Sequence, residues 1–415
     1  MQKVLAIQRA SRLPSAPQWS PVVSARQALL SLYIGSYSKS FDSLPSFLEE
    51  SSARHLQVSV DAVGLAFMAF KLNRRDLIHL ANQRYVAALR SLGMAMQSLT
   101  QATSNAANHS LKDATLQSAL LLDLYEKIAY QHYQSSEPQG LLLSHIHGAL
   151  SLVQSRPRGE FSNSMIQQLA AQSVHTCVIS CSTANIPVPE AVVRLYHDLS
   201  RRICSTRWFM QGLVIRIVDL NADMRGGRTN PSNVLKRARD LYNGFSGIEG
   251  SVPRISRPRR RDTCETLAFN GYYDVYQTPK NIQLFNLCRC ERLDLALIIQ
   301  KFEPSAEITE NIAQATEAIC ASVPGLMLPA ARPHNTLPLS PLQILECSAV
   351  LPALVAAARY TQDPAMQDWI LRTLTHMANH GIQLAQKVAN IIMFEPHLCQ
   401  WDVFQLVGSY AILTL

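Results

Sequence analysis

The residues best suited to chemistry in this sequence are the basic residues between Arg225 and Asp262. That segment holds ten Lys or Arg residues and three acids, an excess of seven that supplies nearly the whole formal charge of +8. Short basic runs of this kind are typical of nuclear localisation signals and of surfaces that contact phosphate. A solvated loop that touches phosphate weakly is an equally good interpretation. The candidate residues of this basic loop are Arg254, Arg257, Arg259, Arg260 and Arg261.

A second group of polar residues is a candidate for lining a pocket. Tyr272, Tyr273 and Tyr276 surround Asp274 in the sequence, and His145 is a further candidate. One of His145 and His147 is expected to turn inward on a helix. Phenol and imidazole groups can hydrogen-bond a ligand or move a proton. Aromatic residues at helical spacing are more often part of the core, so both interpretations stay open.

Motifs for metal, nucleophile and cofactor chemistry are incomplete. His376 and His380 stand four residues apart, a spacing that can place two zinc ligands on one helix face, but Met377 stands where a metalloprotease carries its glutamate. The segment Gly244–Ile248 is one residue short of the nucleophile elbow. Neither a phosphate-binding glycine loop nor a dinucleotide fingerprint is present. We therefore expect no metal and no cofactor.

The elements that must position these residues are helices. Apolar residues recur every three or four positions over long stretches, which is the period of an α-helix with one buried face. The clearest stretches are 77–99, 112–134, 281–302 and 343–359. The pattern predicts an all-α fold, a large irregular bundle of roughly fifteen helices.

Glycine and proline divide the chain into a few larger parts. We expect a flexible N-terminal segment over residues 1–23 and one helical domain over residues 24–415. Within that domain, clusters of glycine, proline and arginine predict surface loops near residues 246–262 and 324–341.

The overall composition excludes several classes of protein. Apolar residues make up 47% and charged residues 16%, which is incompatible with a disordered chain. The nine cysteines are spread out and odd in number, so we expect buried free thiols in a reducing compartment. Neither a long apolar run nor a secretory signal is evident, so we expect no membrane span.

Four helical phrases resemble the fungus-specific transcription factor domain. The fourth is the most telling, because it is similar to the His-x-x-Gly-Ala-x-x-Leu helix of that family. The phrases occur in the family's order at Val60–Ala66, Arg84–Arg90, Leu121–Glu126 and His145–Leu152. The resemblance covers roughly residues 25–415 and is strongest up to about residue 220.

The turn after the fourth phrase also resembles that family, in which an Arg-Gly turn leads to an aromatic residue. Here the turn is Arg156–Gly159, followed by Phe161, and it is two residues longer than usual. Family members normally carry a six-cysteine domain that binds two zinc ions and reads DNA. The first cysteine of this sequence is Cys177, so the preceding residues contain no such zinc cluster.

The resemblance implies a regulatory protein of fungal, secondary-metabolite gene expression that lacks its own DNA reader. It would be a nuclear co-regulator or ligand-sensing scaffold, and its partner would be another transcription factor or co-regulator. Nucleic acid would be bound weakly and without specificity at most. A small-molecule ligand and a homodimer stay open.

An enzyme is the alternative, because a fold does not dictate function and a pocket between helices can acquire chemistry. A cofactor-independent isomerase or cyclase, working in the cytoplasm, would need only placed acids and bases.

Overall fold

The structure is a computed structural model that describes residues 20–38, 41–50, 53–101, 106–129, 141–184, 186–398 and 400–407. It is 79% helical, and the described residues include sixteen α-helices of eight residues or more. The predicted all-α class is therefore confirmed. Most of the predicted flexible segment, residues 1–19, lies outside the described residues.

The helices and strands follow one another along the chain in this order. The elements up to residue 225 are α2 Pro21–Ala28, η1 Leu29–Ser38, α3 Leu44–Glu50, α4 Arg54–Ala66, η2 Phe67–Lys71, η3 Arg75–Leu77, α5 Ile78–Gln101, α6 Ala106–Ala129, α7 Leu141–Gln154, η5 Arg158–Ser162, α8 Ser164–Ala184, α9 Glu190–Ser200 and α10 Thr206–Arg225. The later elements are α11 Pro231–Ser251, η6 Arg254–Ser256, β1 Arg259–Asp262, η7 Phe269–Gly271, β2 Tyr272–Val275, α12 Pro279–Phe302, α13 Ala306–Ser322, α14 Pro324–Met327, α15 Pro341–Ser348, α16 Leu351–Tyr360, α17 Pro364–Asn379, α18 Gln383–Phe394 and α19 Gln400–Val407.

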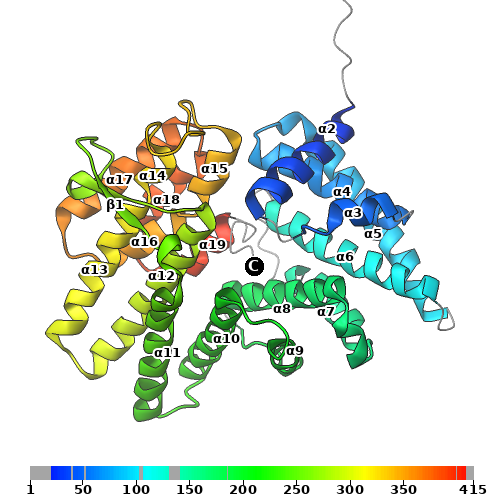
Figure 1. Ribbon diagram of the computed structural model, residues 1–415, viewed down its shortest axis with the longest axis horizontal. Coiled ribbons are helices and arrows are strands. Elements are labelled where there is room, and N and C mark those ends of the chain that lie inside the picture. Colours follow the sequence, from blue (N-terminus) through cyan, green and yellow to red (C-terminus); the bar gives the residue numbers. More distant parts are fainter. Residues whose placement is uncertain are drawn as a thin grey trace, which may run out of the picture.

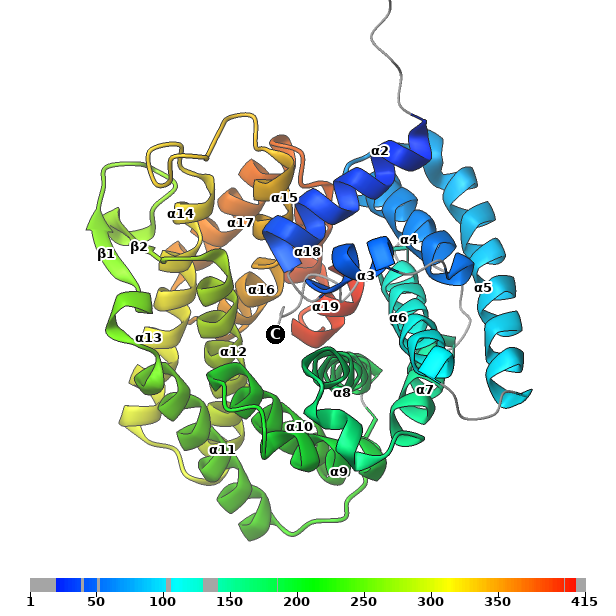
Figure 2. The same ribbon diagram turned by 45° about the vertical axis from the view of Figure 1, so that its right-hand side comes forward.

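The helices are arranged around α19. Figure 1 shows the chain passing from α2–α6 on the right, through α7–α10 at the bottom, to α11–α18 on the left. The path closes because η1 contacts α15. The turned view in Figure 2 places α19 in the middle, where it contacts α8 and α16.

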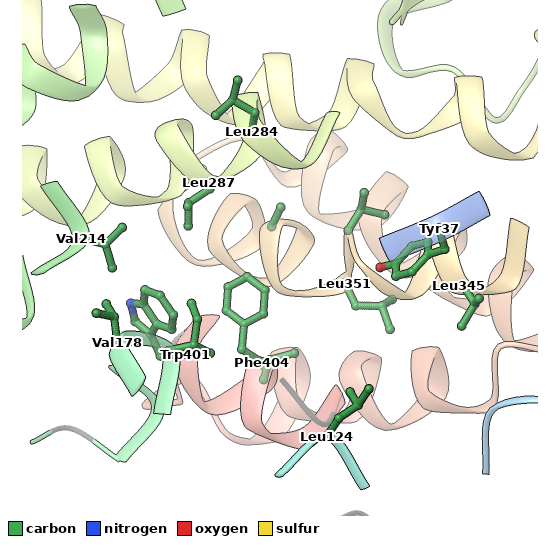
Figure 3. Close-up of a cluster of buried hydrophobic side chains, with 14 of the residues drawn as sticks. Tyr37, Leu124, Val178, Val214, Leu284, Leu287, Leu345, Leu351, Trp401 and Phe404 are labelled. Atoms are coloured by element: carbon green, nitrogen blue, oxygen red, sulfur yellow. The ribbon is translucent and has the colours of Figure 1, made fainter. Parts of the chain in front are cut away.

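The core is built where these helices face one another. Figure 3 shows Trp401 and Phe404 of α19 among buried side chains from several helices. Val178 comes from α8, Val214 from α10 and Leu284 from α12, and all three are buried. Because apolar residues from distant parts of the chain meet here, their removal from water favours the closed arrangement.

The helical domain begins slightly earlier than predicted. The helix α2 starts at Pro21, and the side chain of Ser20 accepts a hydrogen bond from the Val23 amide (3.3 Å). Serine is a preferred N-cap and proline is tolerated in the first helical turn. The boundary expected between residues 23 and 24 was therefore wrong by three residues.

The four phrases that resemble a known family lie in four helices that pack together. They occupy parts of α4, α5, α6 and α7, and α4 packs on both α5 and α6. The turn that follows α7 is fixed by Arg156, whose buried guanidinium donates to Asp113 of α6 (2.5 Å). These segments thus form one contiguous part of the fold.

The loop predicted near residues 246–262 is largely ordered secondary structure, so that prediction was wrong. Helix α11 continues to Ser251 because Phe245 and Ile248 are buried on its inner face. Beyond it come the short helix η6 and the strand β1. Local glycines weaken a helix by only about 1 kcal/mol each, and this packing outweighs that cost.

The second predicted loop, near residues 324–341, is correct only in part. Its first residues form α14 and are buried, and the rest follows without a helix until Pro341. The amide of buried Asn335 donates to the carbonyls of Gly325 (3.1 Å) and Leu328 (2.8 Å). The connection is therefore anchored to α14 rather than projecting freely.

The helix predicted over residues 343–359 is two helices. α15 ends at Ser348 and α16 begins at Leu351, with Pro352 in its first turn, where the missing N–H is tolerated. The stretch Pro341–Tyr360 is the one part of the described chain whose length and apolar composition would suffice to cross a membrane. Within the fold, 78% of its most apolar window is buried, as expected of core helices.

Candidate functional site: a basic hairpin and two polar networks

The predicted basic residues lie on and next to a two-stranded antiparallel hairpin. Strand β1 pairs with β2 so that Arg260 faces Asp274 and Arg261 faces Tyr273. All four residues of β1 are exposed, whereas Tyr272 and Tyr273 of β2 are buried against the protein. Figure 2 shows the hairpin at the outer edge of the molecule, beside α13 and α14.

The hairpin forms because β2 buries its tyrosines, while the neighbouring strand β1 is charged and exposed. The tyrosines of β2 pack on α13 and α14, where Gly325 brings the helix backbone close: a Cβ there would lie 3.2 Å from the Asp274 carbonyl oxygen. Asn270 (φ 55°) and Gly271 (φ 74°) adopt the left-handed conformation that returns the chain. The arginines therefore occupy the outer edge of a small sheet, a place where charge prevents unwanted strand pairing.

The five candidate arginines differ in their contacts. Arg257 donates to the carbonyls of Gly250 (2.6 Å) and Val252 (3.1 Å), so it caps the end of α11. Arg260 lies over the Tyr272 ring, 3.7 Å from its centre, and Arg261 donates to the Tyr273 hydroxyl (3.4 Å). Arg254 and Arg259 make no side-chain hydrogen bond within the described residues.

None of the five arginines forms an ion pair with a described acid. Asp274 of β2 has a pKa that is raised by burial against the opposing effect of Arg289 and Arg260. Burial also raises the pKa of Tyr272 to about 12, so this phenol stays neutral beneath Arg260. The hairpin thus presents exposed arginines that form no ion pair with a described acid, and they lie on a strand instead of the surface loop expected from the sequence.

Tyr276 belongs to a buried network behind the hairpin. Its hydroxyl accepts a hydrogen bond from Arg289 of α12 (2.9 Å), which also donates to the Asn286 side chain (3.0 Å) and the Ala318 carbonyl (3.0 Å). Burial raises the pKa of Tyr276 to about 12. The tyrosines lie on and after a strand, not at helical spacing, and they join the hairpin to the core.

His145 lies apart from these tyrosines, in a second network among α5, α6 and α7. Its Nε2 is 3.1 Å from Oε1 of Glu126, the same oxygen that accepts a hydrogen bond from the Tyr85 hydroxyl (2.5 Å). The side chain of His145 is 13% exposed, whereas His147 on the same helix is exposed. One turn before Glu126, buried Asp123 accepts a hydrogen bond from Lys127 (2.7 Å).

Electrostatics in this second network favour a charged imidazole. Burial lowers the pKa of His145, but its hydrogen bond to Glu126 and the charges of Glu126 and Asp123 outweigh burial and raise the pKa overall. One oxygen of Asp123 and one of Glu126 are buried without a hydrogen-bond partner among the described residues. Such a grouping of phenol, carboxylate and imidazole can accept or donate a proton.

Sequence reasoning did not identify Tyr85 and Glu126 as partners of His145. All three belong to phrases that resemble the fungal domain, and this was the available signal. Their proximity depends on the packing of three helices, which periodicity does not specify. Among the described residues, no three His, Cys, Asp or Glu side chains are placed to hold one metal ion, and the rings of His376 and His380 stack on each other.

The free cysteines of the described chain are mostly buried. Cys177, Cys181, Cys288, Cys290, Cys320 and Cys347 are buried, whereas Cys204 and Cys264 are exposed. Comparisons with known proteins add no identity: no family model, no curated protein and no solved structure matches this chain.

Proposed function

We propose that this chain is a nuclear regulatory protein of fungal gene expression, a co-regulator that relies on a partner to read DNA. The observation that carries the proposal is the basic hairpin, whose exposed arginines have no acidic partner among the described residues. Uncompensated arginine on an outer edge suits recognition by the acidic surface of an import receptor or partner. The resemblance of α4–α7 to a transcription factor domain supports the same conclusion.

The role of a partner follows from what this sequence contains. The six-cysteine zinc cluster is not found before Cys177, and the eight described cysteines form no metal site. The hairpin arginines would attract nucleic acid through phosphate alone, which gives binding without sequence preference that weakens as salt is added. On the basis of the resemblance, we propose a DNA-reading transcription factor as the partner of this regulator.

The proposal is tested by the location of the chain fused to two fluorescent proteins, a size that prevents passive entry into the nucleus. We expect the native fusion to be nuclear. A variant with Arg254, Arg259, Arg260 and Arg261 replaced by Gln should be cytoplasmic. Arg257 is retained because it caps α11.

The matched control removes the same charge from exposed positions in helices or directly after one, at Arg90, Arg194, Arg201 and Arg372. This control should remain nuclear. A cytoplasmic native fusion, or a hairpin variant that remains nuclear, would overturn the proposed role of the hairpin. Thermal unfolding of both variants shows whether they are folded.

An enzyme remains the second candidate, and the observation that favours it is the contact of Tyr85, Glu126 and His145. A proton-transfer site of this kind needs no cofactor, as in an isomerase or a cyclase. A native fusion that is cytoplasmic from the outset would favour this alternative.

A further inference from the structure

A pocket with a volume of about 250 Å³ lies between two regions of the chain that are far apart in sequence. One wall comes from η2, η3 and the residues between them. The other wall comes from α15 and the beginning of α18. Any molecule bound here would contact both regions at once.

The charge of this pocket has one sign. Lys71, Arg75 and Lys387 contribute to its lining, and none of the lining residues is an acid. Arg75 donates to the Gln383 side chain (3.3 Å), which holds its guanidinium beside the pocket. Neither Arg75 nor Lys387 forms an ion pair with a described acid, so their charge is available to an anion.

The backbone adds to this positive potential. Gln383 and Leu384, the first residues of the twelve-residue helix α18, line the pocket, and Ile382 supplies no side-chain cap to that helix. The first amides of a helix carry a partial positive charge and bind anions. Phe70, Ile344 and Leu345 give the lining an apolar part.

We propose that this pocket binds a small organic phosphate, with the phosphate between Lys71, Arg75, Lys387 and the start of α18. Arg75, Lys387 and a helix terminus, joined by Lys71 once its amine is protonated, provide more positive charge than a single carboxylate needs, whereas a phosphate monoester carries about two negative charges. The apolar surface would receive the organic part. Binding of an organic phosphate is a property beyond the proposed regulatory role. It can be measured on the purified chain whatever the cellular location of that chain.

The test uses phenyl phosphate as the probe and titration calorimetry as the measurement, at about 150 mM salt, where weak surface attraction is screened. We expect saturable binding, with affinity for phenyl phosphate at least about tenfold higher than for benzoate or inorganic phosphate. The variant with Arg75 and Lys387 replaced by Gln should lose at least about tenfold in affinity. Both residues are exposed, so the variant should fold.

The matched control replaces Arg90 and Arg372, two exposed arginines on α5 and α17, by Gln and should bind as the native chain does. Absence of saturable binding, equal affinity for benzoate, or equal loss in the control would overturn the proposal. Each of those results would mean that Lys71, Arg75 and Lys387 form a surface cluster of cations and not a specific binding site for an organic phosphate.

A second measurement follows from Lys71. Burial lowers the pKa of Lys71 to about 7, so at about pH 8 this amine is largely neutral and would take up a proton when an anion binds. Calorimetry in buffers of different ionisation enthalpy should show this uptake in the native chain and not in Lys71→Met. A native chain that binds phenyl phosphate without proton uptake would place the phosphate away from Lys71 and overturn this arrangement.

Discussion

His145 takes its chemical character from helices other than its own. The ring lies on α7, but the carboxylate that it contacts comes from α6 and the phenol on that carboxylate comes from α5. Burial lowers the pKa of His145 and contact with Glu126 raises it, and the result is a raised pKa for a side chain that is 13% exposed. A charged imidazole in this place therefore stabilises the contact of three helices.

We expect this stabilisation to depend on pH. The pKa of His145 is raised in the folded protein, so its contribution is complete below the unfolded value of about 6.5 and is lost as the pH rises through the folded value. His145→Gln should therefore cost more stability at about pH 6 than at about pH 9, by on the order of 1 kcal/mol. Urea unfolding of both proteins at both pH values measures the difference.

The control for this prediction is His147→Gln, on the same helix. The side chain of His147 is exposed and makes no ion pair within the described residues. Its replacement should change stability equally at the two pH values. If His145→Gln shows the same cost at both, the proposed contact does not carry charge.

Helices α2 and α4 are packed so closely that one position between them has no room for a side chain. A Cβ at Gly64 would lie 2.7 Å from the Ala25 carbonyl oxygen and 2.9 Å from its carbon. Both atoms are backbone, so the clash can be relieved only by moving a helix. Nearby, Arg26 of α2 donates to Asp61 of α4 (2.6 Å), which holds the two helices in register.

Gly64→Ala should therefore destabilise the protein by about 1–3 kcal/mol, as overpacking of a close contact does. Gly93→Ala is the matched control, because Gly93 is exposed within α5 and a Cβ there would meet nothing within 4 Å. That substitution should stabilise the protein by about 0.5–1 kcal/mol, because alanine is the better helix former. Thermal or urea unfolding should show that the two substitutions change the free energy of unfolding in opposite directions. A change in the same direction for both would refute the close contact at Gly64.

At the scale of the whole molecule, α19 connects regions that are otherwise distant. Helix α8 contacts it on one side and α16 on another, and Trp401 (5% exposed) packs beside Phe404 within α19. The eight residues of this helix thus hold the middle of the ring that Figure 2 shows. Burial of its apolar side chains contributes to the stability of the entire arrangement.

Trp401→Ala should accordingly destabilise the protein by about 3–5 kcal/mol, the usual cost of removing a large buried side chain. Phe394→Ala is the control, because Phe394 at the end of α18 is 74% exposed and its loss should change stability by no more than about 0.5 kcal/mol. Equal effects on the unfolding midpoint in urea would contradict the central position of α19.

Local features of the sequence predicted the helices well. The stretch 77–99 became α5 and 281–302 became α12, with the expected class confirmed throughout the described chain. Periodicity succeeds because it acts within one or two turns of the chain. Periodicity also has a limit: the apolar pattern over residues 343–359 predicted one helix and did not reveal the break between α15 and α16.

Tertiary structure alone decided which helices meet and what becomes of the basic segment. The arginines of β1 lie in a strand because β2, some ten residues away, buries its tyrosines on α13 and α14. The contact of His145 with Glu126 and Tyr85 requires three helices. The pocket at Lys71 and Lys387 requires two regions that are far apart in the sequence. The amino-acid sequence determined helix positions, since hydrogen bonding within a helix is local. The sites arose only from packing, because burial of apolar faces chooses partners over long sequence distances.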